Sequence, residues 1–446
     1  MVSINALRDI LSLKKTSPTI ILLLNSFSWY ILVTVLFRAI VADLPLIENQ
    51  KTELLMIYFA SIAISAISGS KMRFIDRKNL LYLWSFMGTA TTLCLTFLSG
   101  NVMPVNILIS VFLGFSIGIG LPSCLSYFAD STTNENRGLT AGIIWSIVGF
   151  TILGIAFSTS SLIQWEMMLL LAVWRFLGGI GFLALTLRDK PFSIQKAPSY
   201  SDIIHKKEIL LYLFPWILFL LINFAEIPVL EKAFNSIFEE DIFSFLQLAE
   251  FAVIGLFAII GGVIADRIGR KKIIIPGFIM LGIEYATITV FSVNSITAYT
   301  FLILDGATWG LLYSVFLTVL WGDLGENYQK EKYYVLGGLP YILANVISLL
   351  IKPFASDIGT PAAFSLASFF LFLAVVPLMY APETLPEKTM KDRELKKYIE
   401  KAQKEAAKSQ DKEDWSAQRE NEDAEVEFEV NQEDYEEALK EAEKYY

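Results

Sequence analysis

Charged residues are scarce in this chain of 446 residues: Asp, Glu, Lys and Arg make up only 18% of it, whereas 54% is hydrophobic. Soluble domains of ordinary composition carry more charge, so the composition predicts a membrane protein that crosses the bilayer many times. Cysteine is almost absent. Cys94 and Cys124 both lie in apolar runs and do not form a disulfide framework.

The chain also lacks the residue patterns that enzymes need. Its single histidine, His205, lies in a polar stretch where we expect it to be solvated. No His/Cys spacing for a metal, no nucleophile motif and no phosphate-binding loop is present. We therefore expect no enzyme activity, no catalytic residue, no metal, no cofactor and no nucleic-acid partner. A membrane enzyme acting on lipid is the weaker hypothesis.

Twelve apolar runs reach the length of about 20 residues that a transmembrane helix requires. The sequence predicts spans at 18–40, 53–70, 79–99, 104–127, 138–158, 166–187, 209–230, 242–265, 273–293, 297–320, 333–352 and 361–381. Lys and Arg accumulate in cytoplasmic loops. Nineteen of them fall on one side of this arrangement and only Lys51, Lys232 and Lys352 on the other. The asymmetry predicts that both termini are cytoplasmic. We expect no cleavable signal peptide, because the first run is long enough to span.

A polar interruption with two prolines separates the first six runs from the last six. The sequence predicts an N-terminal six-helix bundle at 1–187, a central cytoplasmic linker at 188–207, a C-terminal bundle at 208–381 and a cytoplasmic charged tail at 382–446. A gapless shift of 193 residues aligns four pairs of positions: Gly69 with Gly262, Arg77 with Arg270, Asp130 with Asp323, and Arg137 with Lys330. This repeat supports the division into two halves.

The tail holds the excess negative charge. From Pro382 onward there are 21 acidic and 12 basic residues, so the formal net charge of −9 belongs to this segment. We expect a basic helix at 387–408 beside the membrane and an acidic stretch from Asp411. Such a tail is either solvated and partly disordered, or docks on anionic lipid or a regulatory partner.

The loop between the eighth and ninth runs reads Gly262-Val-Ile-Ala-Asp-Arg-Ile-Gly-Arg-Lys-Lys272. Gly262 allows one helix to approach a neighbour closely. Asp266 can accept hydrogen bonds from the N–H groups of a neighbouring helix N-terminus. Gly269 permits a tight turn. The basic residues of the loop hold it on the cytoplasmic side: Arg267, Arg270, Lys271 and Lys272.

The pattern G-x-x-x-D-R-x-G-R-K-K in this loop resembles the loop signature of the major facilitator superfamily of solute transporters. The resemblance implies an all-α membrane protein with twelve transmembrane helices in two six-helix pseudo-symmetric halves, the major facilitator fold. The first-half loop departs from the pattern, because Arg73 stands where Asp266 stands in the second half. Ala-Pro-Glu-Thr-Leu-Pro, after the last run, is similar to the exit of sugar-porter members, which implies a sugar-like substrate.

Two features differ from the drug-antiporter branches of the same superfamily. No charged residue occurs between Val111 and Gly120 in the fourth run, and no proline between Gly138 and Ser158 in the fifth. Proton-driven drug export is therefore disfavoured. The glycines and the proline of the fourth run predict a closely packed, flexible helix: Gly114, Gly118, Gly120 and Pro122.

Ionisable side chains inside a membrane are functional candidates by default. Six lie well inside the runs: Arg38, Arg175, Glu226, Glu250, Glu284 and Asp305. The resemblance implies that helices 1, 4, 7 and 10 line a central cavity, which makes Arg38, Glu226 and Asp305 candidates for binding substrate or protons. Glu250 on helix 8 is an intermediate case. Arg175 and Glu284 fall on peripheral helices and are expected to be structural. Asp305 either takes up a proton or forms a permanent ion pair with Arg38.

Aromatic and amide side chains on the same helices complete the candidate binding set. Rings beside amides can stack on an organic solute and hydrogen-bond to it. The candidates are Asn25, Trp29, Tyr30, Asn223, Trp309 and Tyr313.

A third group is expected to form a gate at the cytoplasmic surface. Asp130 and Asp323 end helices 4 and 10, and each precedes a basic position, Arg137 or Lys330. The resemblance implies that each carboxylate binds the basic loop of its own half. Asp323 would then pair with Arg267 or Arg270, and Asp130 with Arg73 or Arg77. Such pairs can break and reform between two arrangements of the halves.

The main hypothesis is a secondary transporter in the cell membrane that moves a small organic solute by alternating access. Its partners are the small-molecule substrate and membrane lipid, with protons as a candidate coupling ion, and we expect a monomer. The alternative is a transporter-like receptor or scaffold that signals through the acidic tail.

Overall fold

A computed structural model describes most of the chain in two separate units. The described residues are 13–72, 75–99, 102–158, 162–186, 197–235, 240–291, 294–354, 358–385, 395, 399, 432 and 434–441. The first unit runs to Pro386 and contains all the long helices. In the second unit, residues 434–441 are helical and exposed. Most of the expected basic helix and acidic stretch lies outside the described residues.

Helices make up the regular structure of the first unit. The helices of the first half are α2 (Leu13–Asp43), α3 (Glu48–Gly69), α4 (Arg77–Cys94), η1 (Leu95–Phe97), α5 (Met103–Gly118), α6 (Leu121–Ser131), α7 (Arg137–Ser158) and α8 (Gln164–Thr186). After the short α9 (Tyr200–Ile204), the second half contains α10 (Lys207–Asn235), α11 (Glu240–Ile268), α12 (Lys271–Val290), α13 (Ser295–Leu312), η2 (Tyr313–Leu320), α14 (Trp321–Leu324), α15 (Glu331–Ile351), η3 (Lys352–Phe354) and α16 (Thr360–Tyr380).

These elements form twelve helices that are long and apolar enough to cross a membrane, which confirms the predicted number. Several extend beyond the apolar runs. The seventh span runs from Lys207 to Asn235 rather than from 209 to 230, and the tenth ends at Leu324 rather than at 320. The reason is that a helix satisfies its own backbone hydrogen bonds and can continue past the apolar run with polar residues.

Two spans are interrupted in the middle. The fourth breaks between α5 and α6, where Pro122 occupies the first turn of the new helix. The tenth changes from α13 to the π-helix η2 and back to α14. Proline suits a helix start because its missing N–H has no intrahelical acceptor there. The close packing expected of the fourth span is present, since a Cβ on Gly118 would lie 2.2 Å from the carbonyl oxygen of Ile62.

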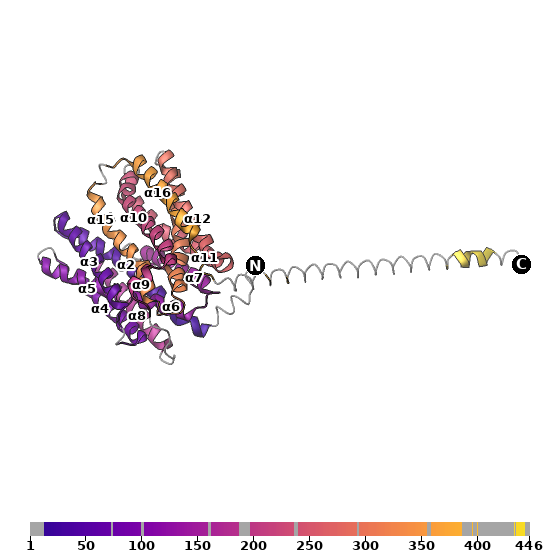
Figure 1. The fold of residues 1–446 in the computed structure, drawn as a ribbon, viewed down its shortest axis with the longest axis horizontal. Helices are drawn as coiled ribbons and strands as arrows, with labels where there is room; N and C mark the ends of the chain where they lie inside the picture. Colours follow the sequence, from indigo (N-terminus) through magenta and orange to yellow (C-terminus); the bar gives the residue numbers. More distant parts are fainter. Residues whose placement is uncertain are drawn as a thin grey trace. The chain divides into compact units, whose positions relative to one another are not determined.

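The two halves lie side by side and meet along two pairs of helices, α7 with α11 and α3 with α15 (Figure 1). Within the first half α2 and α4 pack on α8, and within the second half α10 and α12 pack on α16. We call one end of the bundle the charged end; it carries the described parts of the turns at 70–72, 75–76, 132–136, 269–270 and 325–330. The other is the opposite end.

The contact between α7 and α11 is closest at glycines. A Cβ on Gly142 would lie 2.5 Å from the carbonyl oxygen of Ala258, and one on Gly149 would lie 2.2 Å from that of Phe251. In lipid the hydrophobic effect does not drive helices together, so van der Waals contact between the closely approaching backbones holds α7 against α11. The two halves are therefore joined along this pair of helices.

The described part of the central linker crosses the charged end. The Tyr200 hydroxyl of α9 lies 2.6 Å from the Ser70 hydroxyl of the first half. Lys332 of the second half donates to the Pro198 carbonyl at 2.5 Å and lies 5.5 Å from the Tyr200 ring. The linker thus contacts both halves.

We predict that Gly149→Leu lowers the stability of the folded protein, because the new Cβ meets backbone that cannot move aside as a side chain can. Overpacking of this kind costs about 1–3 kcal/mol. The measurement is thermal unfolding of the detergent-purified protein. Gly154→Leu, five residues further along the same helix, is the matched control, since nothing lies within 4 Å of its Cβ position. Equal melting temperatures for the two variants would contradict the tight α7–α11 contact.

Candidate functional site

A cavity of about 410 Å³ lies between the halves. The first half contributes Tyr30, Thr34 and Arg38 from α2, which are spaced one turn apart and so share a face of the helix. The second half contributes polar and aromatic side chains from six elements: Asn223, Glu226, Glu250, Tyr285, Asp305, Trp309, Tyr313, Tyr341 and Asn345. The volume is in the range of small-molecule sites.

Three carboxylates reach this cavity, all from the second half. Asp305 is buried, and its carboxyl group lies close enough to that of Glu250 and to the Trp309 indole to interact with both. Oδ1 of Asp305 and Oε2 of Glu226 are buried without a hydrogen-bond partner among the described residues. Glu250 therefore belongs to the site as much as the three residues first selected. Glu284 lies behind it, buried and close enough to interact with Asp305.

Arg38 lies at the rim of the cavity and does not pair with Asp305. Its Nη2 donates to Oδ1 of Asn345 on α15 at 2.9 Å, and its guanidinium lies 5.3 Å from the centre of the Phe59 ring. The expected ion pair with Asp305 is thus wrong, because Arg38 is two turns beyond Tyr30 toward the opposite end and reaches across to α15 instead. Arg38 and Asn345 join the two halves there.

Asn25 and Trp29 do not line the cavity, contrary to expectation. They lie on the face of α2 that packs on α4 and α8, where they surround the fully buried Arg175. Arg175 donates to Oδ1 of Asn25 at 2.9 Å, and its guanidinium lies 4.6 Å from the Trp29 ring and 4.3 Å from the Trp84 ring. These contacts hold a buried cation inside the first half. Of the aromatic and amide candidates, Tyr30, Asn223, Trp309 and Tyr313 do line the cavity.

Aromatic rings close the cavity toward the charged end. Tyr313 stacks on Trp145 of α7 with ring centres 4.5 Å apart, and Phe27 lies 4.7 Å from the same indole. The indole N–H of Trp145 donates to the Thr318 hydroxyl in η2 at 2.7 Å. Beyond these rings lies a small apolar space of about 40 Å³, which Leu317 also lines. The cavity and the charged end are therefore separated.

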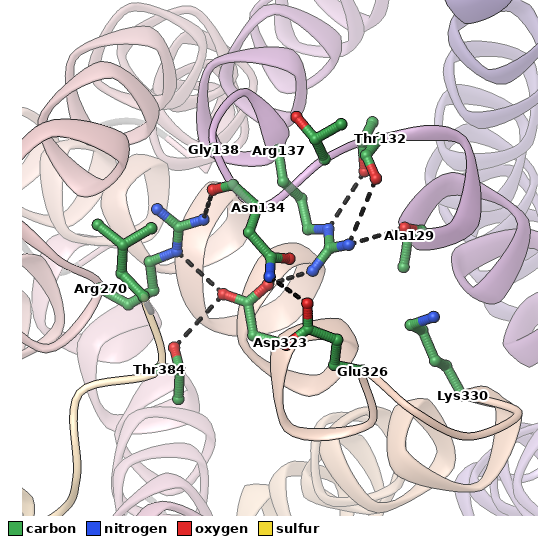
Figure 2. A network of polar contacts seen from close by, with 12 residues as sticks. Ala129, Thr132, Asn134, Arg137, Gly138, Arg270, Asp323, Glu326, Lys330 and Thr384 are labelled. Carbon is green, nitrogen blue, oxygen red and sulfur yellow. Dashed lines mark hydrogen bonds and ion pairs between the residues drawn. The ribbon is translucent and has the colours of Figure 1, made fainter. Parts of the chain in front are cut away.

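Below the rings, Asp323 lies between two arginines, one from each half (Figure 2). Arg270 Nε binds one carboxylate oxygen at 3.0 Å, and Arg137 Nη1 binds the other. Arg270 also donates to the Asn134 carbonyl at 2.7 Å, which ties it to the first half. All three charged side chains are buried. Such pairs need further hydrogen bonds to offset desolvation, and both arginines have them.

Asp130 repeats this arrangement. It binds Arg77 of its own half at 2.6 Å and Lys330 of the other half. The shift of 193 residues that aligns Arg77, Asp130 and Arg137 with Arg270, Asp323 and Lys330 therefore also relates the two sets of contacts. We call the two sets together the gate network.

Asp266 binds the N-terminus of α7, the kind of contact expected from the sequence. Its two oxygens accept from the backbone N–H groups of Gly138 at 2.9 Å and Leu139 at 2.7 Å, and Oδ1 also accepts from Arg270 at 2.8 Å. Gly262 lies beside the same helix start, where a Cβ would be 2.1 Å from the Gly138 carbonyl oxygen. Helix N-termini favour negative charge, so Asp266 fixes α11 to α7.

The loop of the first half also contacts a helix start of the second half, here through an ion pair. Arg73, which replaces the aspartate in its loop, lies outside the described residues. Glu331 occupies the start of α15, where the repeat places the counterpart of Gly138, and it binds Arg77 at 2.7 Å. The acid is thus on the helix rather than in the loop, and Glu331 joins the gate network.

The turn after α11 binds the segment that follows the last helix. Gly269 has a φ of 115°, a conformation that side chains disfavour. Glu383 accepts from the backbone N–H groups of Arg270 at 2.7 Å and Lys271 at 3.2 Å, and Lys271 Nζ donates to the Met379 and Ala381 carbonyls. The Pro-Glu-Thr segment thus belongs to the first unit rather than to the tail.

Each aspartate binds one of the two arginines expected for it, Asp323 with Arg270 and Asp130 with Arg77, whereas Arg267 is exposed. The sequence also missed the pairs that cross between the halves, Arg137 with Asp323 and Lys330 with Asp130. The repeat contains a signal for these pairs. Arg137 and Lys330 are equivalent positions that each follow an aspartate of their own half. When two equivalent halves face each other, each basic residue can bind the aspartate of the other half instead.

Comparisons with known proteins agree with this architecture. No family model matches the chain. A Haemophilus influenzae protein for which a role in metabolite transport has been proposed is 28% identical over 155 residues; the match covers 34% of this chain and spans only about a third, 34%, of that relative.

Solved structures match over a greater length. The human organic anion transporter MFSD10 (TETRAN) has a TM-score of 0.59 at 16% identity, covering 82% of this chain and 99% of that one. The proton:xylose symporter XylE, bound to 6-bromo-6-deoxy-D-glucose, has a TM-score of 0.59 at 15% identity, covering 83% and 96%. Together with the twelve spans, these matches show a multi-pass membrane protein with the fold of the major facilitator superfamily.

We predict that Asp323→Asn opens the charged end. The change leaves two buried arginines without their shared carboxylate, and loss of one partner from a buried pair costs about 3–5 kcal/mol. The measurement is the labelling rate of Leu317→Cys by a water-soluble maleimide, in protein that carries Cys94→Ala and Cys124→Ala. The rate should rise about tenfold or more.

Glu326→Gln is the matched control for this experiment. Glu326 lies three residues away, is exposed and accepts a hydrogen bond from Asn134 at 2.5 Å, which glutamine can also accept. A labelling rate that rises equally in both variants, or in neither, would show that Asp323 does not hold the charged end closed.

Proposed function

We propose that the protein is a secondary transporter that moves a small organic solute across the cell membrane by alternating access, acting as a monomer. The supporting observation is a cavity between the halves whose route to one end is blocked by aromatic rings and by ion pairs that cross from one half to the other. Interfaces of this kind have two discrete arrangements, and movement of the halves exposes the cavity to each side in turn.

We infer the orientation in the membrane from the loops. Basic residues gather at the charged end, which favours a cytoplasmic side for this end and for both termini. The structure then corresponds to the state in which the cytoplasmic gate is closed. Gating is assigned to the gate network and to the contacts of Gly262, Asp266, Gly269 and Lys271 that hold α11 and α12 in place.

The π-helix η2 supports a moving element in the cavity wall. Segments of this kind are rare and often mark functional positions, because they leave the ordinary helical hydrogen-bond ladder. Here the Thr318 hydroxyl donates to the Tyr313 carbonyl at 2.7 Å, five residues back, and the Tyr334 hydroxyl donates to the Thr318 carbonyl at 2.7 Å. The segment links the cavity ring Tyr313 to Asp323 in α14, so a change at either is passed to the other.

Protons are the proposed coupling ion, taken up at Glu250 and Asp305. Two carboxyl groups in contact repel each other when both are ionised, and a proton between them removes the repulsion. The groups that face the pair are Glu226, Glu284, Tyr285 and Tyr313, with no basic side chain in an ion pair with it among the described residues. Proton-coupled symport of a sugar-like solute remains the substrate expectation from the Pro-Glu-Thr segment.

Locking the charged end tests alternating access directly. Asn134 and Glu326 are bonded across the halves at the exposed edge of the gate network. In Asn134→Cys/Glu326→Cys, oxidation should abolish solute flux into proteoliposomes and a reductant should restore it, because the halves can no longer separate. The solute is chosen by a thermal-shift screen, in which a bound ligand raises the melting temperature. Either single variant under the same oxidant is the control. Undiminished flux through the crosslinked protein would refute alternating access.

Asp305→Asn should remove the response of solute uptake to a pH gradient while exchange of labelled for unlabelled solute continues. The amide has the shape of the acid but cannot take up the proton. Both rates are measured in proteoliposomes. Asp43→Asn is the control, since Asp43 is an exposed carboxylate at the opposite end that binds Gln164. A full response in Asp305→Asn would assign coupling to another group.

A further inference from the structure

The charge lining the cavity is one-sided. Glu226, Glu250 and Asp305 face it, against Arg38 alone. None of the three carboxylates takes part in an ion pair between described residues. Asp305 is only 7% exposed, yet its Oδ1 has no hydrogen-bond partner there. A buried carboxylate is costly unless something pairs with it, and these three carboxylates have no positively charged side chain paired with them among the described residues.

Arg38 does not supply that charge. Its guanidinium is held by Asn345 Oδ1 and by the Phe59 ring at the rim, and the acid it interacts with is Glu231, which does not line the cavity. The single charge of Arg38 at the rim is outnumbered by the three carboxylates, which disfavours an anionic solute.

Two of the three amides that line the cavity, Asn223 and Asn345, already make hydrogen bonds within the protein. Asn223 donates to the Tyr285 hydroxyl at 3.0 Å. Asn345 accepts from Arg38 and donates to the Tyr341 carbonyl at 3.0 Å. A sugar needs donors and acceptors that are free to take its hydroxyl groups, and these two amides offer few. Gln247 adds one further amide, and the buried acceptors of the cavity without a hydrogen-bond partner among the described residues are Asp305 Oδ1 and Glu226 Oε2.

Aromatic rings surround the carboxylates. Trp309 lies one turn from Asp305, and its ring is 4.9 Å from that of Tyr313 and 6.0 Å from that of Tyr341. Phe224 lies 5.4 Å from Tyr341 and 6.4 Å from Trp309. All four rings line the cavity. The faces of such rings attract a cation, most strongly where water is excluded, so they add to the attraction of the carboxylates.

We propose that the solute is an organic cation: a protonated amine carried on an aromatic or aliphatic frame. This inference rests on the proposed function, since it names the substrate class of the same cavity. The ammonium group binds between Asp305, Glu250 and Glu226, and the frame lies against Trp309, Tyr313 and Tyr341. A bare metal ion fits less well, because no group of three metal-ligating side chains converges among the described residues.

Three probes of nearly equal shape separate the charge classes: 2-phenylethylammonium, 2-phenylethanol and phenylacetate. D-glucose is the fourth. Their binding to the detergent-purified full chain is measured by titration calorimetry, with no transport step involved. The cation should bind at least about tenfold more tightly than the alcohol, a difference of about 1.4 kcal/mol. Tighter binding of the alcohol, the anion or glucose would overturn the inference.

Variants place the binding in the cavity. Glu226→Gln and Asp305→Asn should each weaken 2-phenylethylammonium about tenfold or more and leave 2-phenylethanol unchanged, a selectivity that a merely loosened fold would not produce. Glu226 is half-buried, so its variant remains informative if Asp305→Asn fails to fold. Cation affinity that survives both changes would place the binding elsewhere and contradict the inference.

The binding result is independent of the proposed transport. Suppose that the protein binds the cation selectively but its crosslinked and free forms carry solute equally well. That result would uphold the inference and reject alternating access. Gated flux of a neutral sugar, with no selective cation binding, would uphold the transporter and reject the cation.

Discussion

Two aspartates buried at the charged end depend on residues of both halves. Asp130 and Asp323 each bind a basic side chain of their own half and one of the other, so neither half satisfies its own charges alone. In a low-dielectric interior a lone charge is strongly unfavourable. The closed arrangement is thus held by electrostatic satisfaction at one end, while the glycine contact of α7 and α11 joins the halves along their length. The residues nearer the opposite end, including those that line the cavity, take no part in this electrostatic contact, so they can be polar without weakening it.

The cavity and the gate are joined through single helices. The tenth span carries Asp305 and Trp309 in α13, Tyr313 at the start of η2 and Asp323 in α14. The fifth span carries Trp145 against Tyr313 and Arg137 against Asp323. A displacement of the rings by a solute therefore acts on the same backbones that position the ion pairs. The π-helix η2 lies between the cavity residues and the ion pairs of the gate network. A change in its helical register would therefore act on both.

How far the sequence predicts this structure depends on the constraint involved. The bilayer requires each span to satisfy its own backbone hydrogen bonds, so the twelve helices could be found from apolar length alone. Asp266 on a helix N-terminus followed from the chemistry of its loop. The face that a helix turns inward is harder, because lipid and protein interior are equally apolar. Asn25 and Trp29 could not be distinguished from Tyr30 for that reason. The crossed pairs of Arg137 and Lys330 needed the packing of one half on the other.

The gate network has a further property. Together with Asp266 it contains four basic groups, Arg77, Arg137, Arg270 and Lys330, and four acidic ones, Asp130, Asp266, Asp323 and Glu331. A transmembrane voltage does work only on net charge that moves through the field, about 2.3 kcal/mol per unit charge for each 100 mV. These eight groups carry no net charge, so a displacement that they share does no net work in the field. The three carboxylates of the cavity are not matched by an equal number of basic groups. A transmembrane voltage therefore acts on the charge of the proton or solute that they bind.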